Sequence, residues 1–264
     1  MKLGAVMPVY SDEQLAQLME GLETVADRAA IMVERLLSFS FKDPKAEEYA
    51  YHGLSRRITS IAHSVQRVFE ELPPDMEGLP DLASREEATV HIQSVAFHTY
   101  GCFDNLAHIW VAERNIKRDD GRAIPPRLIG FGEKCEDVLA SLPASLQSQL
   151  AEIRPWMRFL EAFRHSSAHR IPVYIPPFVM DPRRVDEYNT YTDAIGAAIR
   201  ASRLIEAGAI AEKKAAMRKF RPMVATSIYA NTATALFHPQ LLADFATVEE
   251  WTNSVLQALS SPKT

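Results

Sequence analysis

Residues 12–39, DEQLAQLMEGLETVADRAAIMVERLLSF, carry apolar side chains at alternating steps of three and four residues. This spacing follows the 3.6-residue turn of an α-helix, so these side chains share one face of the helix. They are Leu15, Leu18, Leu22, Val25, Ala29, Met32, Leu36 and Phe39. Ser11 and Asp12 stand at the start of the run, where both residue types favour a helix cap. The stretch therefore predicts a long amphipathic helix that needs other helices to cover its apolar face.

The same period returns in three further stretches, each bounded by prolines or by the loop KRDDGRAIPP. They cover residues 45–72, residues 84–118 and a stretch from about residue 143 to His169. No self-similarity at the period of a helical repeat protein is present, which disfavours a solenoid. Helices of similar length joined by short breaks favour a mainly α protein built as an antiparallel helical bundle over residues 1–170.

The composition changes after residue 170. Three stretches rich in proline and β-branched residues predict short edge strands, namely IPVYIPPFV (171–179), FRPMVATSIY (220–229) and TATALFH (232–238). Residues 185–217 read as helix with a break at Gly208, and residues 241–259 read as a final helix. We expect residues 171–264 to form an extension with strands and helices that packs on the bundle as one structural unit.

Composition limits the function. The chain has 264 residues, 47% apolar residues and a formal charge of −5, which indicates a folded core and disfavours a generally basic nucleic-acid binder. Any contact with nucleic acid is then limited to a local patch. Cys102 and Cys135 have no metal-ligand spacing and read as small core residues in a reducing compartment. With no signal-peptide pattern and no long apolar run, we expect a cytoplasmic protein without membrane contact.

The helix that ends at His169 has an unusual polar residue on its apolar face. Its stripe is made by Leu146, Leu150, Ile153, Met157 and Leu160. Arg164 continues this stripe, and an unpaired buried guanidinium costs several kcal/mol. The arginine must therefore open to a cleft, meet a carboxylate or lie at a subunit interface.

A neighbouring strip of the same helix is cationic and consists of Arg154, Arg158, His165 and His169. Cations at a helix carboxyl end are favoured by the helix dipole, so a purely structural role is open. The two histidines are four residues apart on the helix, a spacing that would let both bind one metal ion. The glutamate of the HExxH pattern is absent, however, and we expect no metal and no cofactor.

The hexapeptide RHSSAH, residues 164–169, resembles the Arg–polar–x–x–x–His signature of HEPN-domain proteins, which are helical bundles. The spacing alone also fits Arg57 with His63 and Arg85 with His91, but only Arg164 continues an apolar stripe near a helix end. HRIPVYIPPF and LFHPQLLADFATVEE also resemble an uncharacterised bacterial group that has a HEPN-like core and a strand-bearing extension.

The resemblance implies metal-independent cleavage of RNA, in which the 2′-hydroxyl attacks the adjacent phosphate. His169 would act as general base or acid, and Arg164 would hold the phosphate. His165 would orient His169 or the scissile phosphate. Arg154 and Arg158 are candidates for binding flanking phosphates. HEPN proteins pair two motifs across a dimer, so the resemblance also implies a homodimer. The alternative is a non-catalytic scaffold of the same fold that binds an anion, a nucleotide or a protein partner.

Other polar residues allow more than one interpretation. A strip on residues 84–118, formed by Glu87, His91, Ser94, His98 and Asn105, favours a solvated face or a hydrogen-bonded seam over a site. Asp244 fits a helix cap, and the spacing leaves the role of His238 open.

Overall fold

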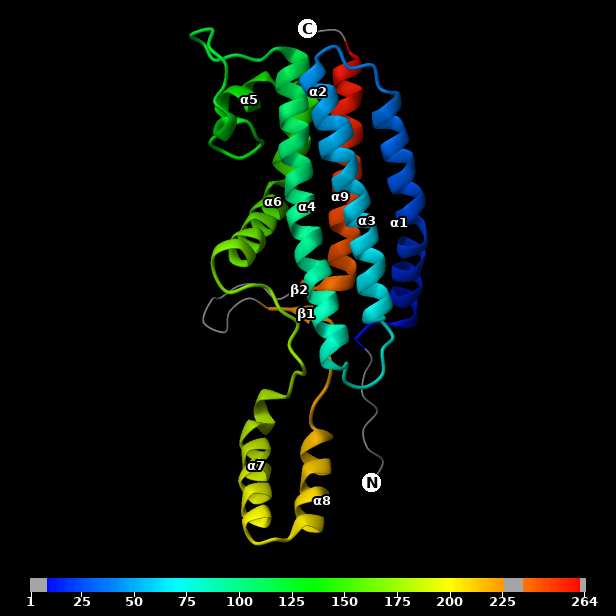
Figure 1. Ribbon diagram of the computed structural model, residues 1–264, viewed down its shortest axis with the longest axis vertical. Coiled ribbons are helices and arrows are strands. Elements are labelled where there is room, and N and C mark those ends of the chain that lie inside the picture. Colours follow the sequence, from blue (N-terminus) through cyan, green and yellow to red (C-terminus); the bar gives the residue numbers. More distant parts are fainter. Residues whose placement is uncertain (1–8, 226–234, 262–264) are drawn as a thin grey trace.

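The computed structural model describes residues 9–225 and 235–261. Long helices lie side by side as a bundle (Figure 1). They are α1 (Asp12–Ser38), α3 (Ser55–Glu71), α4 (Leu82–Arg114) and α9 (Phe237–Ser260). The prediction of a mainly α protein with a helical bundle and a small β part is confirmed.

The helix that completes the bundle is α9, whereas we expected the helix that ends at His169. α9 packs against α1, α3 and α4, but α6 (Ala144–His169) packs chiefly against α4, on its outer side (Figure 1). The reason is the size of the apolar face, because α9 buries Phe237, Phe245 and Trp251 while α6 buries only leucines. α9, which follows residue 170 in the chain, thus packs within the bundle.

The direction of α9 also departs from a simple antiparallel bundle. Arg28 and Arg35 of α1 contact Glu249 and Asn253 of α9 in the same order along both helices. α1, α4 and α9 thus run in one direction, and α3 runs in the other (Figure 1).

The predicted helix over residues 45–72 contains a π-helical segment. It begins as α2 (Pro44–Glu48), continues as the π-helix Tyr49–Leu54 and ends as α3. Gly53 lies in this segment, where a Cβ atom would come within 2.4 Å of the Asn105 Nδ2 atom of α4. The close approach of α4 therefore requires glycine at this position.

Short elements connect the bundle to α6. A 3₁₀ turn at Pro126–Leu128 and α5 (Glu136–Ser141) lie between α4 and α6. Cys135 precedes α5 and is buried, as is Cys102 in α4. Both cysteines are free, which agrees with their interpretation as small core residues.

The β part is small. β1 (Met223–Val224) pairs antiparallel with β2 (Ala235–Leu236). Two isolated bridges, Tyr174 with Ala225 and Val179 with Lys219, join the segment after α6 to the segment before β1. Phe237 and His238, which we predicted as strand, instead begin the helix α9 (Phe237–Ser260), and residues 226–234 of the two predicted strands lie outside the described residues.

α7 (Val185–Arg200) and α8 (Leu204–Ala215) form a helical hairpin that extends away from the bundle (Figure 1). We predicted the break at Gly208, which instead lies inside α8. The chain turns at Ser202, whose φ is 60°, and the Arg203 N–H donates to the Ala198 carbonyl at 2.9 Å. This bond closes the end of α7, and Ala198 of α7 and Ala207 of α8 are both buried.

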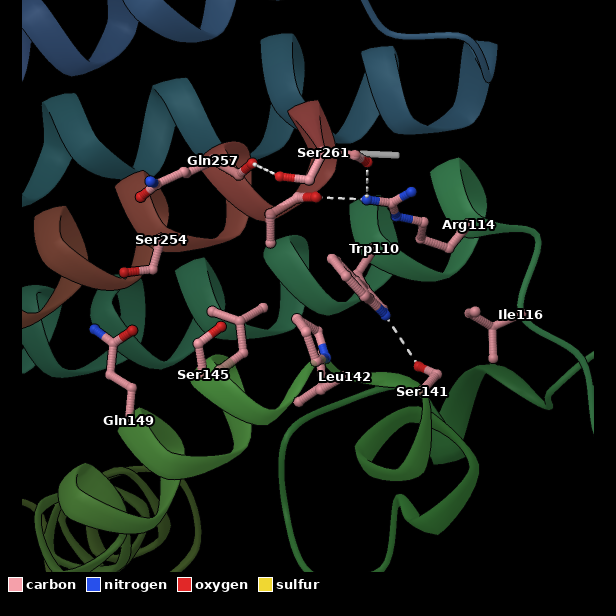
Figure 2. Close-up of a pocket in the computed structure, with 13 residues that line it drawn as sticks. Trp110, Arg114, Ile116, Ser141, Leu142, Ser145, Gln149, Ser254, Gln257 and Ser261 are labelled. Atoms are coloured by element: carbon pink, nitrogen blue, oxygen red, sulfur yellow. Dashed lines mark hydrogen bonds between the residues drawn. The ribbon is translucent and has the colours of Figure 1, made fainter. Parts of the chain in front are cut away.

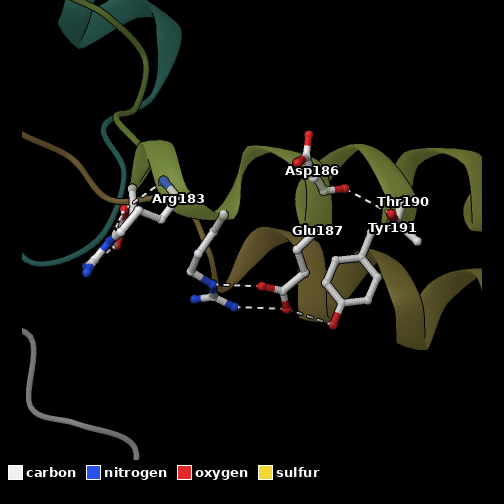
Figure 3. Close-up of polar contacts among 7 residues, drawn as sticks. Arg183, Asp186, Glu187, Thr190 and Tyr191 are labelled. Atoms are coloured by element: carbon white, nitrogen blue, oxygen red, sulfur yellow. Dashed lines mark hydrogen bonds and ion pairs between the residues drawn. The ribbon is translucent and has the colours of Figure 1, made fainter.

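Ion pairs organise the start of α7 after a 3₁₀ turn at Pro182–Arg184. The Arg184 Nε–H donates to the Glu187 carboxylate at 2.8 Å. This carboxylate also accepts from the Tyr191 hydroxyl, and Figure 3 shows Glu187 and Tyr191 pointing toward each other. Arg183 pairs with Asp181 in the same way. These contacts lie at the surface, so they help to define where the helix begins and add little to overall stability.

The core centre combines aromatic residues from separate elements. Trp251 of α9 stacks on Phe103 of α4 with ring centroids 5.9 Å apart, and Phe131 meets Trp251 edge-on. Phe131 belongs to the loop before α5, so this contact fixes that loop against the bundle. Within the described residues, no helix combines the length and apolarity that a membrane span requires.

Candidate functional site

The motif helix α6 is held on the bundle by apolar contacts and by one buried polar link. It begins after Pro143 and buries Leu146, Leu150 and Leu160. The Trp156 Nε1–H donates to the Asp244 Oδ1 atom of α9 at 2.7 Å. The contact ties the middle of α6 to α9 and fixes how α6 lies against α4.

Arg164 is half-buried and points to α4. Its guanidinium carbon lies 4.4 Å from the centre of the Tyr100 ring, in a cation–π contact. Asp104 stands one turn further along α4. Burial raises the pKa of this carboxyl to about 6, and the neighbouring Arg164 and Arg57 oppose that rise. The contact that the structure gives Arg164 is thus an aromatic ring, and the charge of Arg164 acts on the Asp104 carboxyl.

The two motif histidines lie elsewhere on the helix. His165 and His169 are exposed, and their ring centroids are 5.1 Å apart at an interplanar angle of 79°. His169 is the last residue of α6. The rings of His169, the predicted general base or acid, and of His165, predicted to orient it, therefore lie side by side, while the Arg164 guanidinium packs on Tyr100.

The two candidate phosphate-binding arginines share one carboxylate. Glu133, in the loop before α5, lies 2.6 Å from Arg158 and 3.7 Å from Arg154. Arg158 lowers the pKa of Glu133 by hydrogen bonding and by its charge, with a smaller effect from Arg154. Both guanidiniums thus face an anion that the chain itself supplies.

A pocket of about 440 Å³ lies where these residues meet. Its wall comes from α4, from α6 and from the loop that precedes α5. The lining includes Tyr100, Asp104, Arg127, Glu133, Arg154, Arg158 and Glu161. Sequence reasoning missed Tyr100, Asp104 and Glu133. The only sequence signal for Asp104 was a carboxylate at the edge of an apolar helix face. Many surface residues share that signal.

His238 and Asp244 both have structural roles. The buried His238 donates from Nε2 to the Leu72 carbonyl at 2.7 Å, and the Tyr10 hydroxyl contacts its Nδ1 atom. Burial lowers the pKa of His238 to about 4, so the ring stays neutral at physiological pH. Asp244 accepts from Trp156 and from Gln240. Neither residue faces the motif histidines.

The polar strip on α4 is a hydrogen-bonded seam with α3. His91 contacts the Ser64 hydroxyl, which donates to Ser94. Further along, the Arg57 Nε–H donates to the Asn105 Oδ1 atom at 2.8 Å. These contacts join two neighbouring helices of the bundle, which supports the structural interpretation of the strip.

A second pocket, of about 630 Å³, lies between α4, α6 and the end of α9 (Figure 2). Its polar lining consists mainly of serine and glutamine side chains, and the Trp110 Nε1–H donates to the Ser141 hydroxyl. Arg114 donates to carbonyls at the end of α9. The described lining holds no histidine, cysteine or carboxylate, so it offers no group for proton transfer at neutral pH.

Arg164→Leu is expected to destabilise the fold by about 1–3 kcal/mol, because it removes the contact with Tyr100 and the nearest cation of Asp104. The pKa of Asp104 already lies above that of an exposed aspartate, so its charge disfavours the folded state above about pH 6. Without Arg164 this effect grows, and the loss should be larger at pH 8 than at pH 4. Urea unfolding at both pH values measures it. Arg158→Leu, at an exposed arginine, is the control. An unchanged stability for Arg164→Leu would contradict a structural role for Arg164.

Among residues 9–225 and 235–261, no group of three or more His, Cys, Asp or Glu side chains is placed to hold a metal ion. No family model matches the chain, and comparisons with curated proteins and with solved structures give no match either.

Proposed function

We propose that this protein is a HEPN-like, metal-independent endoribonuclease of the cytoplasm. The observation that carries the proposal is the exposed pair formed by His165 and His169 at the end of α6, with ring centroids 5.1 Å apart. An exposed imidazole exchanges protons readily near neutral pH, and a phosphodiester in solution can reach both rings.

The chemistry needs one proton to be removed and another to be supplied. His169 takes the proton from the 2′-hydroxyl, whose oxygen attacks the adjacent phosphorus. The bond to the 5′-oxygen breaks, that oxygen takes a proton from solvent water, and the products are a 2′,3′-cyclic phosphate and a 5′-hydroxyl. His165, as the neighbour of His169, orients that ring or holds the scissile phosphate.

Stabilisation of the phosphate requires a cation, and the HEPN resemblance gives this role to Arg164. Arg164 packs on Tyr100, on another side of α6 from His169. We propose that two copies associate as a homodimer, so that Arg164 of one protomer approaches the histidines of its partner. Light scattering tests this step, and a strict monomer at micromolar concentration would count against the composite site.

A non-catalytic role has one observation in its favour. Arg154 and Arg158 hold the carboxylate of Glu133, which shows that an anion fits between them. A scaffold that binds an anion, a nucleotide or an acidic partner through these arginines is therefore the second candidate function.

Incubation of the full chain with single-stranded RNA in EDTA tests the ribonuclease proposal. We expect cleavage to persist, to leave cyclic phosphate ends and to depend on pH through the histidine range. Cleavage that EDTA abolishes and zinc restores would indicate a metal enzyme. RNA that is retained in a gel-shift assay but stays intact would support the scaffold instead.

A further inference from the structure

The pocket between α4 and α6 has features of a ligand site that the histidine motif does not use. Its volume of about 440 Å³ lies within the range of small-molecule pockets, roughly 300–1,000 Å³. Phe103, Ile129 and Met157 supply apolar and aromatic surface, and charged side chains stand around it. Neither His165 nor His169 lines it.

The charges in this pocket are separated. Arg154 and Arg158 act on Glu133, whereas the cations that influence Asp104 are Arg164 and Arg57. Asp104 lines the pocket from α4, whereas Arg154 and Arg158 line it from α6, so the carboxyl and the two guanidiniums belong to different walls. Within the described residues no hydrogen bond ends on Asp104, so the carboxyl is free to accept from a ligand. The pocket matches a molecule with an anion at one end and hydrogen-bond donors at the other.

Glu133 shows where that anion sits. Its carboxylate contacts both arginines, yet the Glu133 and Arg158 side chains are 63% and 69% exposed. Exposed ion pairs contribute little to stability, so another anion can replace this carboxylate at small cost. A phosphate monoester has more charge and more acceptor oxygens than a carboxylate, and two guanidiniums suit it.

We infer that this pocket binds a nucleoside monophosphate, with Arg154 and Arg158 on the phosphate and Asp104 accepting from hydroxyl or amino groups of the nucleoside. Glu133 occupies the phosphate position when the ligand is absent and swings out when it binds. This inference goes beyond the proposed RNA cleavage, because it involves none of the histidines.

Isothermal titration calorimetry of the full chain with AMP, adenosine and inorganic phosphate tests the inference. We expect AMP to bind more tightly than either fragment. Glu133→Gln removes the competing carboxylate and should tighten AMP binding by roughly threefold to tenfold. Arg158→Gln should weaken it by about tenfold or more. Glu136→Gln, three residues along and in contact with neither arginine, is the matched control and should change nothing.

Several results would overturn the inference. One is an AMP affinity that Glu133→Gln leaves unchanged or lowers. A second is an equal increase in AMP affinity from Glu136→Gln, and a third is no binding of AMP to either the parent or the Glu133→Gln chain. His169→Ala should bind AMP as the parent does. RNA cleavage without AMP binding would contradict only the nucleotide-binding proposal. AMP binding without RNA cleavage would contradict only the ribonuclease proposal.

Discussion

His169→Ala is expected to lower the rate of RNA cleavage by about 10²- to 10⁴-fold while the melting temperature stays that of the parent. The rate falls because alanine cannot take the proton from the attacking 2′-hydroxyl, and a positioned general base contributes about this factor. The fold is unaffected because the ring is exposed and contacts chiefly His165. Surface changes of this kind alter stability by about 0.5 kcal/mol or less. Single-turnover cleavage of a labelled RNA and thermal unfolding measure the two effects.

His52→Ala is the matched control for this experiment. His52 is also exposed, but it lies in the π-helical segment Tyr49–Leu54 and not on α6. We expect full activity from this variant, and a smaller loss from His165→Ala than from His169→Ala, because His165 orients and does not move the proton. Equal cleavage by His169→Ala and the parent would remove this histidine from the reaction.

Asp244→Ala is expected to lower the free energy of unfolding by about 2–4 kcal/mol. The aspartate is 5% exposed and is the acceptor for both Trp156 and Gln240. Alanine leaves these donors without their partner and releases the link between α6 and α9, and each buried unpaired group costs about 1–3 kcal/mol. Urea unfolding followed by tryptophan fluorescence measures the change.

Asp244→Asn separates the hydrogen bonds from the charge. Both donors bond the Oδ1 atom, which asparagine keeps. Burial raises the pKa of Asp244 from 3.8 to about 6, so the unfolded chain releases this proton more readily than the folded one. The parent therefore loses stability as pH rises from about 4 to above 6, on the order of 2–3 kcal/mol. Asp244→Asn should lack this loss, and an identical pH dependence in both proteins would contradict the buried charge.

Local patterns in the sequence were sufficient to predict most helices. The stretch over residues 12–39 appears as Asp12–Ser38, and Ser11 forms a capping box with Gln14. This succeeds because the 3.6-residue period and the cap depend on neighbours within one or two turns. Gly208 misled the interpretation of residues 185–217, since the chain turns at Ser202, where φ is positive, and Gly208 lies inside α8.

The candidate site was predictable only in part. RHSSAH identified His165 and His169, and the helical period indicated that Arg164 faces away from them. The partners were not visible, because Tyr100 lies on another helix and Glu133 lies in a loop. Loops carry no periodic signal that tells which charge their side chains will meet.

The sequence by itself determined where this chain is helical, which faces are apolar and which helix carries the motif. The tertiary structure decided that α9 completes the bundle, that Arg164 packs on Tyr100, and that a carboxylate of the chain holds Arg154 and Arg158. The physical reason is the range of the interactions. Helix formation is governed by residues one turn apart, whereas burial and charge pairing depend on which surfaces compete for the same core, as the bond from Trp156 to Asp244 across 88 residues shows.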